Sequence, residues 1–145
     1  MQNDFPKGAV LVFGGSGGIG QGVAGAVGVA VAETKRPILC LSGDGSSMYS
    51  IQALWTAANQ KLPMTFLICN NGGYQILKNR LKAFHGNDKP IGMDFKDPPI
   101  DATVLAKGFG VAAERVDTAA GFDAALAKSL ANTGGPTLVE VMVKS

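Results

Sequence analysis

The 145-residue sequence has little net charge and no long apolar run, and both shortages narrow its possible partners. Thirteen basic and eleven acidic residues leave a formal charge of only +2, which does not favour binding to nucleic acid or to a membrane surface. No apolar run approaches the ~20 residues that a membrane-spanning helix needs. The first residues do not follow a signal-peptide pattern. We therefore expect neither a nucleic-acid nor a membrane partner.

Cysteine and histidine are also scarce. Cys40 and Cys69 both fall inside predicted buried strands, and neither has a CxxC spacing or a histidine partner. Such cysteines are usually inert buried thiols, which fits a reducing compartment, so we expect a cytoplasmic protein. The single histidine, His85, opens an irregular stretch at 85–100, where we expect its side chain to be solvated. A loop of this length is typically functional or mobile.

Glycine, in contrast, is abundant: the sequence has twenty glycines, and nine of them lie before residue 30. A short strand predicted at 9–13 leads into a glycine-rich turn and then a helix over 19–33. This helix contains Gly20, Gly22, Gly25 and Gly28. Each glycine inside a helix costs about 1 kcal/mol relative to alanine. We therefore expect another backbone or a ligand to lie close to this helix.

Two short apolar runs, each broken by a polar turn, organise the chain. Residues 38–42 end at the turn Gly-Asp-Gly-Ser (43–46), and residues 64–69 end at Asn-Asn-Gly-Gly (70–73). The segment between them, 47–60, has the length and apolar spacing of a helix. The order strand, turn, helix, strand, turn is that of a parallel βαβ unit.

Parallel strands bring both polar turns to the same carboxyl edge of the sheet. Asp44 and Asn71 are therefore expected to face one crevice, where open α/β folds bind their ligands. Oxygen donors on glycine-rich turns, beside a helix N-terminus, suit a hard divalent cation that carries a phosphate group.

The rest of the chain continues the alternation of helices and strands. The patterns predict helices at 74–84, 102–107 and 119–131, and strands at 111–116 and 137–143. Asp101 and either Asp117 or Thr118 are expected to cap helices, and Trp55 is expected in the core. Lys78, Arg80 and Lys82 are expected to face solvent. The fold class is α/β: a three-layer α/β/α domain with a mainly parallel sheet of about five strands and helices on both faces.

The GDG turn, followed after some two dozen residues by NN, resembles the motif that binds thiamine diphosphate (ThDP). Residues 14–143 resemble the C-terminal diphosphate-binding domain of ThDP-dependent 2-oxo acid decarboxylases, and residues 43–63 are most similar to the benzoylformate decarboxylase branch. The resemblance implies a shortened lead-in at 1–8 and a diphosphate-binding domain at 9–145. It also implies a homo-oligomeric enzyme whose pyrimidine-binding domain is absent from this chain.

The resemblance implies two cofactors, ThDP and Mg²⁺. The metal ligands would be the Asp44 carboxylate, the Asn71 side chain and the Gly73 carbonyl. Ile19 would prop the two cofactor rings, and Ile76, with Leu77, would line an apolar cavity above the reactive carbon. The cofactor-binding residues implied in full are Gly17, Ile19, Gly45, Ser46, Asn71, Gly73, Tyr74 and Ile76.

The chemistry that the resemblance implies is non-oxidative cleavage of a 2-oxo acid, in which the cofactor's C2 ylide attacks and carbon dioxide leaves. The ylide needs a glutamate at the pyrimidine N1′, which the family takes from the separate domain. Glu33, Glu114 and Glu140 match no such motif. We therefore expect a lyase as part of a larger enzyme, no catalytic residue in this chain, and no activity from the chain alone.

Other functions use some of the same residues. Acetolactate synthases and oxalyl-CoA decarboxylases share the two motifs, and a non-catalytic ThDP-binding subunit would need only the binding residues. Residues 14–20, 70–73 and 74–78 also resemble motifs of NAD(P)-dependent short-chain dehydrogenases. That family places its catalytic tyrosine dozens of residues beyond the asparagine turn, whereas Tyr74 directly follows it here. An α/β domain with ordinary turns would leave the motif spacing unexplained.

Overall fold

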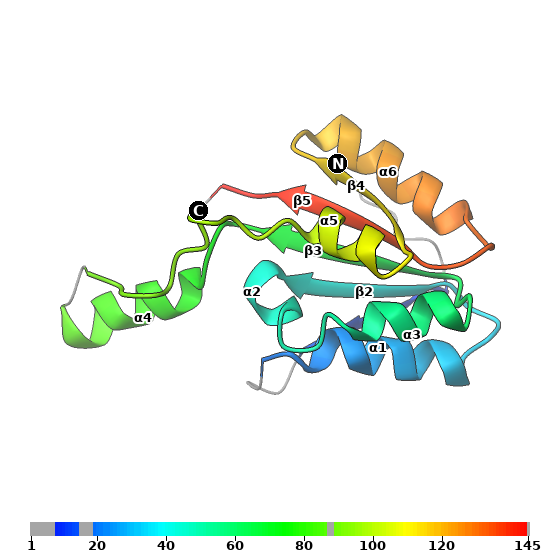
Figure 1. Ribbon diagram of the computed structural model, residues 1–145, viewed down its shortest axis with the longest axis horizontal. Helices are drawn as coiled ribbons and strands as arrows, with labels where there is room; N and C mark the ends of the chain where they lie inside the picture. Colours follow the sequence, from blue (N-terminus) through cyan, green and yellow to red (C-terminus); the bar gives the residue numbers. More distant parts are fainter. Residues whose placement is uncertain (1–7, 15–18, 87–88, 145) are drawn as a thin grey trace.

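The computed structural model describes residues 8–14, 19–86 and 89–144, and it confirms the predicted α/β fold. Within these ranges, five parallel strands form one sheet in the order β1-β2-β3-β5-β4 (Figure 1). The strands are β1 (Val10–Phe13), β2 (Ile38–Gly43), β3 (Met64–Asn70), β4 (Ala112–Val116) and β5 (Thr137–Met142). All carboxyl ends point to the same edge of the sheet, at the left in Figure 1.

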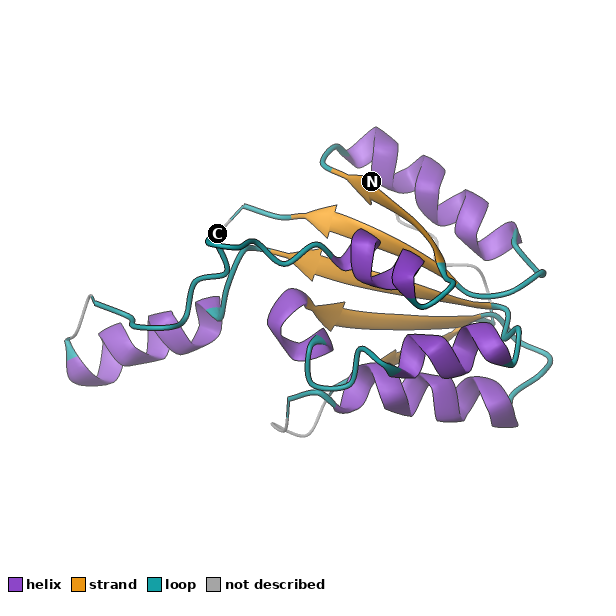
Figure 2. Cartoon of the chain, in the orientation of Figure 1, coloured by secondary structure: helices purple, strands orange, loops and turns teal. Residues whose placement is uncertain are grey.

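Helices lie on both faces of the sheet, and they connect the strands in sequence (Figure 2). The helices are α1 (Gln21–Ala32), α2 (Asp44–Ser47), α3 (Ala53–Asn59), α4 (Gln75–His85), α5 (Ala102–Gly108) and α6 (Ala119–Ala131). Helices α1, α3 and α5 pack on one face and form the larger core with it. Helix α6 packs on the opposite face.

The two cores follow from the alternation of side chains along each strand. Phe66 and Ile68 of β3 point into the larger core, while Leu67 between them points to the α6 side. Successive side chains of a strand face opposite sides of a sheet, so a strand covered on both faces reads as one continuous apolar run. This is why residues 64–69 could be recognised as a buried strand.

The segment after α2 differs from the single predicted helix, and the difference corrects the expected place of Trp55. From the end of α2 into the first turn of α3 the backbone forms i→i+3 hydrogen bonds, including Leu54 N–H to Ile51 O at 3.1 Å and Trp55 N–H to Gln52 O at 3.0 Å. Such tighter turns place every third residue on one face. Ile51, Leu54 and Ala57 therefore enter the core, and Trp55 is 57% exposed.

The expectation of a close neighbour at the helix glycines is confirmed at two of the four positions. A Cβ added to Gly22 would lie 3.4 Å from Gly14 N, and one added to Gly20 would lie 2.3 Å from Tyr49 Cβ. Gly20 also has φ +92°, a conformation that favours glycine. Gly25 and Gly28 are exposed, and no atom of the described residues outside the surrounding helix backbone lies within 4 Å of the corresponding point.

Helix ends follow the predicted capping chemistry at two places. The Asp101 carboxylate accepts hydrogen bonds from the N–H groups of Thr103 and Val104, and Thr118 Oγ1 accepts from Gly121 N–H. These side chains satisfy N–H groups that have no partner inside the helix. None of the helices in the described ranges is both long and apolar enough to span a bilayer.

Candidate functional site

The pairing of β2 with β3 brings the two polar turns together. Gly43 lies opposite Cys69 in the parallel register, so Asp44 starts α2 directly beside the turn that follows Asn70. Asp44 Oδ2 accepts hydrogen bonds from Gly72 N–H at 2.9 Å and from Gly73 N–H at 3.1 Å. The carboxylate and the asparagine turn are thus joined across the crevice between two strand ends.

The surroundings of the Asp44 carboxylate suit the binding of a cation. Its side chain is only 4% exposed, and Oδ1 accepts a third hydrogen bond, from Gly45 N–H at 2.8 Å. None of the ion pairs among the described residues includes Asp44. Buried charges are usually paired or bound to a metal, because burial of an isolated charge costs much free energy.

The turn itself requires glycine at two positions. Gly72 has φ +74°, in the left-handed region. A Cβ on Gly73 would lie 2.3 Å from Met93 O, because residues 93–95 pair with the turn. Tyr74 N–H donates to Met93 O and Phe95 N–H donates to Gly72 O, each at 2.9 Å. The irregular stretch after His85 thus supports the back of the turn, a function that sequence reasoning could not specify.

The oxygen atoms at this edge fit Mg²⁺ better than a soft metal. They are the Asp44 carboxylate, the Asn71 side-chain oxygen and the Gly73 carbonyl. Asn71 Oδ1 and Gly73 O each accept one backbone N–H, at 3.3 Å and 3.0 Å, and each retains a second lone pair. In the described part of the chain, no three His, Cys, Asp or Glu side chains gather as a metal site. A set of oxygen donors with one charge suits Mg²⁺ that also binds phosphate.

A cleft of about 610 Å³ opens beside this edge. Ile19, Ser46, Ile76 and Leu77 line it, together with Arg80. The remaining predicted residues that the structure describes lie in the adjoining turns rather than in the lining: Asp44, Gly45, Asn71, Gly73 and Tyr74. Gly17 lies outside the described residues.

Gly45 and Tyr74 form a tight contact that sequence reasoning missed. A Cβ on Gly45 would lie 2.5 Å from Tyr74 Cε1, and the Tyr74 ring packs edge-to-face on Phe95 with centroids 4.8 Å apart. Burial and a hydrogen bond with Tyr49 raise the pKa of Tyr74. The Gly45 N–H already donates to Asp44, so a bound phosphate would compete with that bond.

Helix α4 contributes charge as well as apolar surface to the cleft. Of its three basic residues that were expected to face solvent, Arg80 and Lys82 are exposed, whereas Lys78 is partly buried. Arg80 lines the cleft and can attract an anionic ligand there. The Lys78 side chain is only 17% exposed and pairs with Asp94 at 2.6 Å, so the pKa of Asp94 is lowered.

Cys69 also lines the cleft and is partly buried, and burial, followed by the Asp44 charge, raises the pKa of its thiol.

The other cysteine behaves as the sequence predicted. Cys40 is fully buried, and burial raises the pKa of its thiol to about 12. His85 lies at the exposed end of α4.

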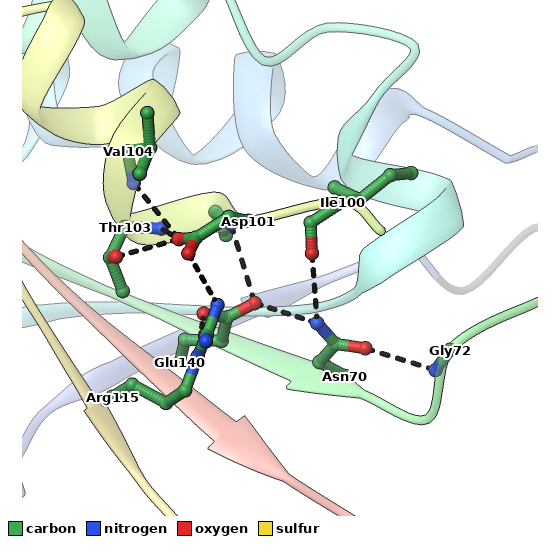
Figure 3. A network of polar contacts seen from close by, with 9 residues as sticks. Asn70, Gly72, Ile100, Asp101, Thr103, Val104, Arg115 and Glu140 are labelled. Atoms are coloured by element: carbon green, nitrogen blue, oxygen red, sulfur yellow. Dashed lines mark hydrogen bonds and ion pairs between the residues drawn. The ribbon is translucent and has the colours of Figure 1, made fainter. Parts of the chain in front are cut away.

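A buried polar network lies directly behind the turn (Figure 3). Glu140 of β5 is fully buried, and its carboxylate accepts hydrogen bonds from Asn70, Ala102 and Arg115. The pKa of Arg115 is raised, first by its hydrogen bond to Glu140. Sequence reasoning gave Glu140 and Arg115 no role. The available signal was a lone charge inside an otherwise apolar final strand.

The parallel sheet, the buried carboxylate at its carboxyl edge and the adjoining glycine turns are typical of a class of protein: the open α/β domains that bind their ligands at the carboxyl edge of the sheet. Comparison with known proteins gives the family. Residues 2–141 match the C-terminal TPP binding domain of thiamine pyrophosphate enzymes, and the chain belongs to this family. Thiamine pyrophosphate is another name for thiamine diphosphate.

Relatives come from two branches of the family. The chain is 44% identical to a Mycobacterium tuberculosis protein provisionally named acetolactate synthase large subunit IlvX, with 89% of this chain and 26% of the relative aligned. It is 37% identical to benzoylformate decarboxylase of Pseudomonas aeruginosa, with 89% of this chain and 24% of that enzyme aligned. The chain therefore spans about a quarter of these relatives.

Solved structures agree on the fold. The ThDP-dependent 4-hydroxybenzoylformate decarboxylase of Rhodococcus jostii RHA1 superposes with a TM-score of 0.87 at 35% identity. The superposition covers 96% of this chain and 30% of that enzyme. The five-stranded parallel sheet with its helices is thus the ThDP-binding fold.

Proposed function

We propose that this chain binds ThDP through Mg²⁺ as the diphosphate-binding part of a 2-oxo acid decarboxylase resembling benzoylformate decarboxylase. One observation carries the proposal: Asp44, buried and without an ion pair among the described residues, contacts the Gly72–Gly73 turn across the edge of two parallel strands. In this proposal one charged and two neutral oxygen ligands on the two joined turns bind a single cation. Family membership identifies the cofactor.

The residues of the chain have distinct tasks in this proposal. Asp44, Asn71 and the Gly73 carbonyl hold the metal. Ser46, which lines the cleft, donates a hydrogen bond to a phosphate oxygen. Ile19, exposed by 49%, and Ile76, exposed by 66%, offer apolar surface to the rings of the cofactor. Together with Tyr74, Gly45 and Gly17 these are the proposed binding residues. When bound, ThDP supplies the electron sink that lets carbon dioxide leave a 2-oxo acid.

The chain needs a partner to complete the active site. None of its glutamates lies at the cleft among the described residues: Glu140 is buried behind the turn, Glu114 pairs with Lys128 and Glu33 pairs with Arg36. We propose that a pyrimidine-binding domain, in the same polypeptide or another subunit, supplies the acid that contacts N1′. The cofactor would lie between the two domains of a homo-oligomer.

A second candidate is an acetolactate synthase-like reaction, which the 44% identity to the Mycobacterium tuberculosis relative favours. Both candidates use the same binding residues and begin with a 2-oxo acid. They differ in whether a second 2-oxo acid is joined to the product. Analysis of the products formed from pyruvate and from benzoylformate by the complete enzyme would distinguish them.

The proposed metal site is tested by replacing its only charged ligand. We expect Asp44→Ala to weaken Mg²⁺-dependent ThDP binding by more than about 100-fold, because loss of even a supporting residue of a metal site costs about 10–100-fold. Calorimetric titration of ThDP, with Mg²⁺ or with a chelator, measures this. Circular dichroism must show that the variant is folded.

Asp123→Ala is the matched control, because Asp123 is exposed on α6, away from the cleft. This variant should bind ThDP as the wild type does. Undiminished affinity in a folded Asp44→Ala variant would refute the metal site.

A further inference from the structure

The buried network behind the turn is continuous with the proposed metal site. Glu140 Oε1 accepts from Asn70 Nδ2 at 2.7 Å, and Glu140 Oε2 accepts from Arg115 Nε at 2.7 Å. Arg115 also pairs with Asp101, the cap of α5, at 2.9 Å. These contacts join β3, β4, β5 and the start of α5 around one carboxylate that is 0% exposed (Figure 3).

The chemistry of a carboxylate determines which way the Asn70 amide points. An ionised carboxylate has no hydrogen to donate, so it can only accept hydrogen bonds from its neighbours. The Asn70 NH₂ group therefore faces Glu140, and the Asn70 oxygen is left to face the turn. There it accepts the Gly72 N–H at 2.9 Å. A neutral partner that could both donate and accept would permit either amide orientation.

The Gly72 N–H connects this network to Asp44. It is shared between Asn70 Oδ1 and Asp44 Oδ2, at 2.9 Å each, so the turn is held by β3 and by the start of α2. Gly72 separates the two proposed ligands on this turn, Asn71 and Gly73. A shift of Gly72 would move both of them relative to Asp44.

We propose that Glu140 is a positioning residue for the metal site: by orienting the Asn70 amide it fixes the Gly72 N–H, and so the turn that presents Asn71 and Gly73 to the cation. The effect on cofactor binding rests on the proposed function. The effect on the turn does not, because the contacts are present in the chain itself. Arg115 balances the charge of Glu140 and supports its orientation.

Hydrogen exchange tests the positioning directly, without cofactor. We expect Glu140→Gln to accelerate exchange of the Gly72 and Gly73 amides by about tenfold or more, measured by NMR on the folded chain. The side-chain amide that this substitution introduces cannot accept with both of its terminal atoms, so either Asn70 or Arg115 loses its acceptor. Amides in the centre of β2 report global stability and serve as the internal reference.

Two further variants separate positioning from general destabilisation. Glu114→Gln is the matched control, since Glu114 lies on the neighbouring strand β4 and forms an exposed pair with Lys128 at 3.0 Å. It should leave the turn amides unchanged. The double variant Asn70→Asp/Glu140→Gln reverses donor and acceptor while it keeps an acceptor for Gly72 N–H, and it should restore part of the lost protection.

Mg²⁺-dependent ThDP affinity is the second readout, and we expect Glu140→Gln to weaken it by about 10–100-fold. The inference is overturned if Gly72 and Gly73 exchange no faster than the β2 reference predicts, or if the double variant exchanges as fast as the single one. If the wild-type chain shows no Mg²⁺-dependent ThDP binding, the proposed function fails. The exchange result still decides whether Glu140 positions the turn.

Discussion

At the residue scale, Asp44 shows how a glycine-rich edge can hold a buried charge. Three backbone N–H groups, from Gly45, Gly72 and Gly73, point at its two oxygens. They stabilise the carboxylate without adding a positive side chain that would compete with a metal ion. They leave about one lone pair of the carboxylate, on Oδ1, for a cation. A lysine or arginine in this place would neutralise the site before a cation could bind.

The Asp101 cap allows a test of stability against pH. Hydrogen bonds, first from the Thr103 side chain, hold the pKa of Asp101 below its ordinary value of 3.8. We expect Asp101→Ala to lower the free energy of unfolding by about 1 kcal/mol at neutral pH. A lowered pKa means that this stabilisation is complete above the unfolded-state pKa and is lost as pH falls through the folded-state pKa. Urea denaturation at a series of pH values measures it.

The difference between wild type and Asp101→Ala should therefore shrink below about pH 4. Asp123→Ala, at an exposed position of α6, should change stability by less than about 0.5 kcal/mol. A difference for Asp101→Ala that stayed constant down to about pH 2, below the usual range of aspartate pKa values, would show that the carboxylate does not act as the cap.

At the scale of elements, α4 differs from the other long helices. None of its residues is buried, and it extends away from the body of the domain (Figure 1). Its apolar side chains Ile76, Leu77 and Phe84 are exposed, and the Lys78–Asp94 ion pair ties it to the segment that supports the turn. Because helices in proteins are stabilised mainly by packing, α4 should be the least stable of the long helices.

Native-state hydrogen exchange tests this prediction. Amides of α4 should exchange through local opening, at least about tenfold faster than amides of α1, whose Val23 and Ala26 are buried in the core. Lys78→Gln should accelerate α4 by a further factor of about five, the equivalent of about 1 kcal/mol. Lys107→Gln, at an exposed position of α5, is the control. Equal protection of α4 and α1 would contradict the prediction.

At the scale of the whole molecule, the two faces of the sheet are covered unequally. Helix α6 covers the β5 side of its face, and an apolar groove remains beside it. The groove has a volume of about 180 Å³ and is lined by Leu11, Leu39, Leu41, Leu67, Cys69, Phe122 and Val141. Leu11 is 43% exposed and Phe13, on the same strand, is 60% exposed. Contiguous apolar surface of this kind drives association.

We therefore expect the chain by itself to dimerise or aggregate. Leu11→Thr should reduce association, because it makes the groove polar while threonine keeps the β-strand preference. Val104→Thr is the control, since Val104 is 62% exposed on α5, away from the groove. Sedimentation velocity over a range of concentrations measures the effect. A wild-type chain that stays monomeric at high concentration would contradict this expectation.

The complete site is also a property of the whole molecule. We expect the chain alone, saturated with ThDP and Mg²⁺, to release carbon dioxide from benzoylformate or pyruvate at no more than background rate. Lack of the acid at N1′ alone would remove about 10²–10⁴-fold. The open cleft also leaves the cofactor in water, which weakens electrostatic stabilisation of the transition state.

Carbon dioxide release by the chain, with and without a pyrimidine-binding domain added in trans, measures this. Activity that appears only on addition would support a shared active site. Appreciable turnover by the chain alone would place the catalytic acid within these 145 residues.

The sequence alone determined the succession of strands and helices along the chain and the meeting of Asp44 with the asparagine turn. Apolar runs, breaking turns and capping residues such as Asp101 are local signals, and parallel pairing then leaves one edge for both motifs. These features depend on local patterns and on the general rule that parallel strands share one carboxyl edge, so no knowledge of particular side-chain contacts was required.

The tertiary structure decided the features that depend on distant neighbours. Trp55 faces solvent because i→i+3 turns before α3 alter the helical phase, and Gly73 is needed because Met93 O lies where a Cβ would be. Glu140 reaches Asn70, 70 positions earlier in the chain, only because β5 pairs with β3. The role of a side chain in such a contact depends on the partner that folding brings to it. A local sequence pattern does not identify that partner.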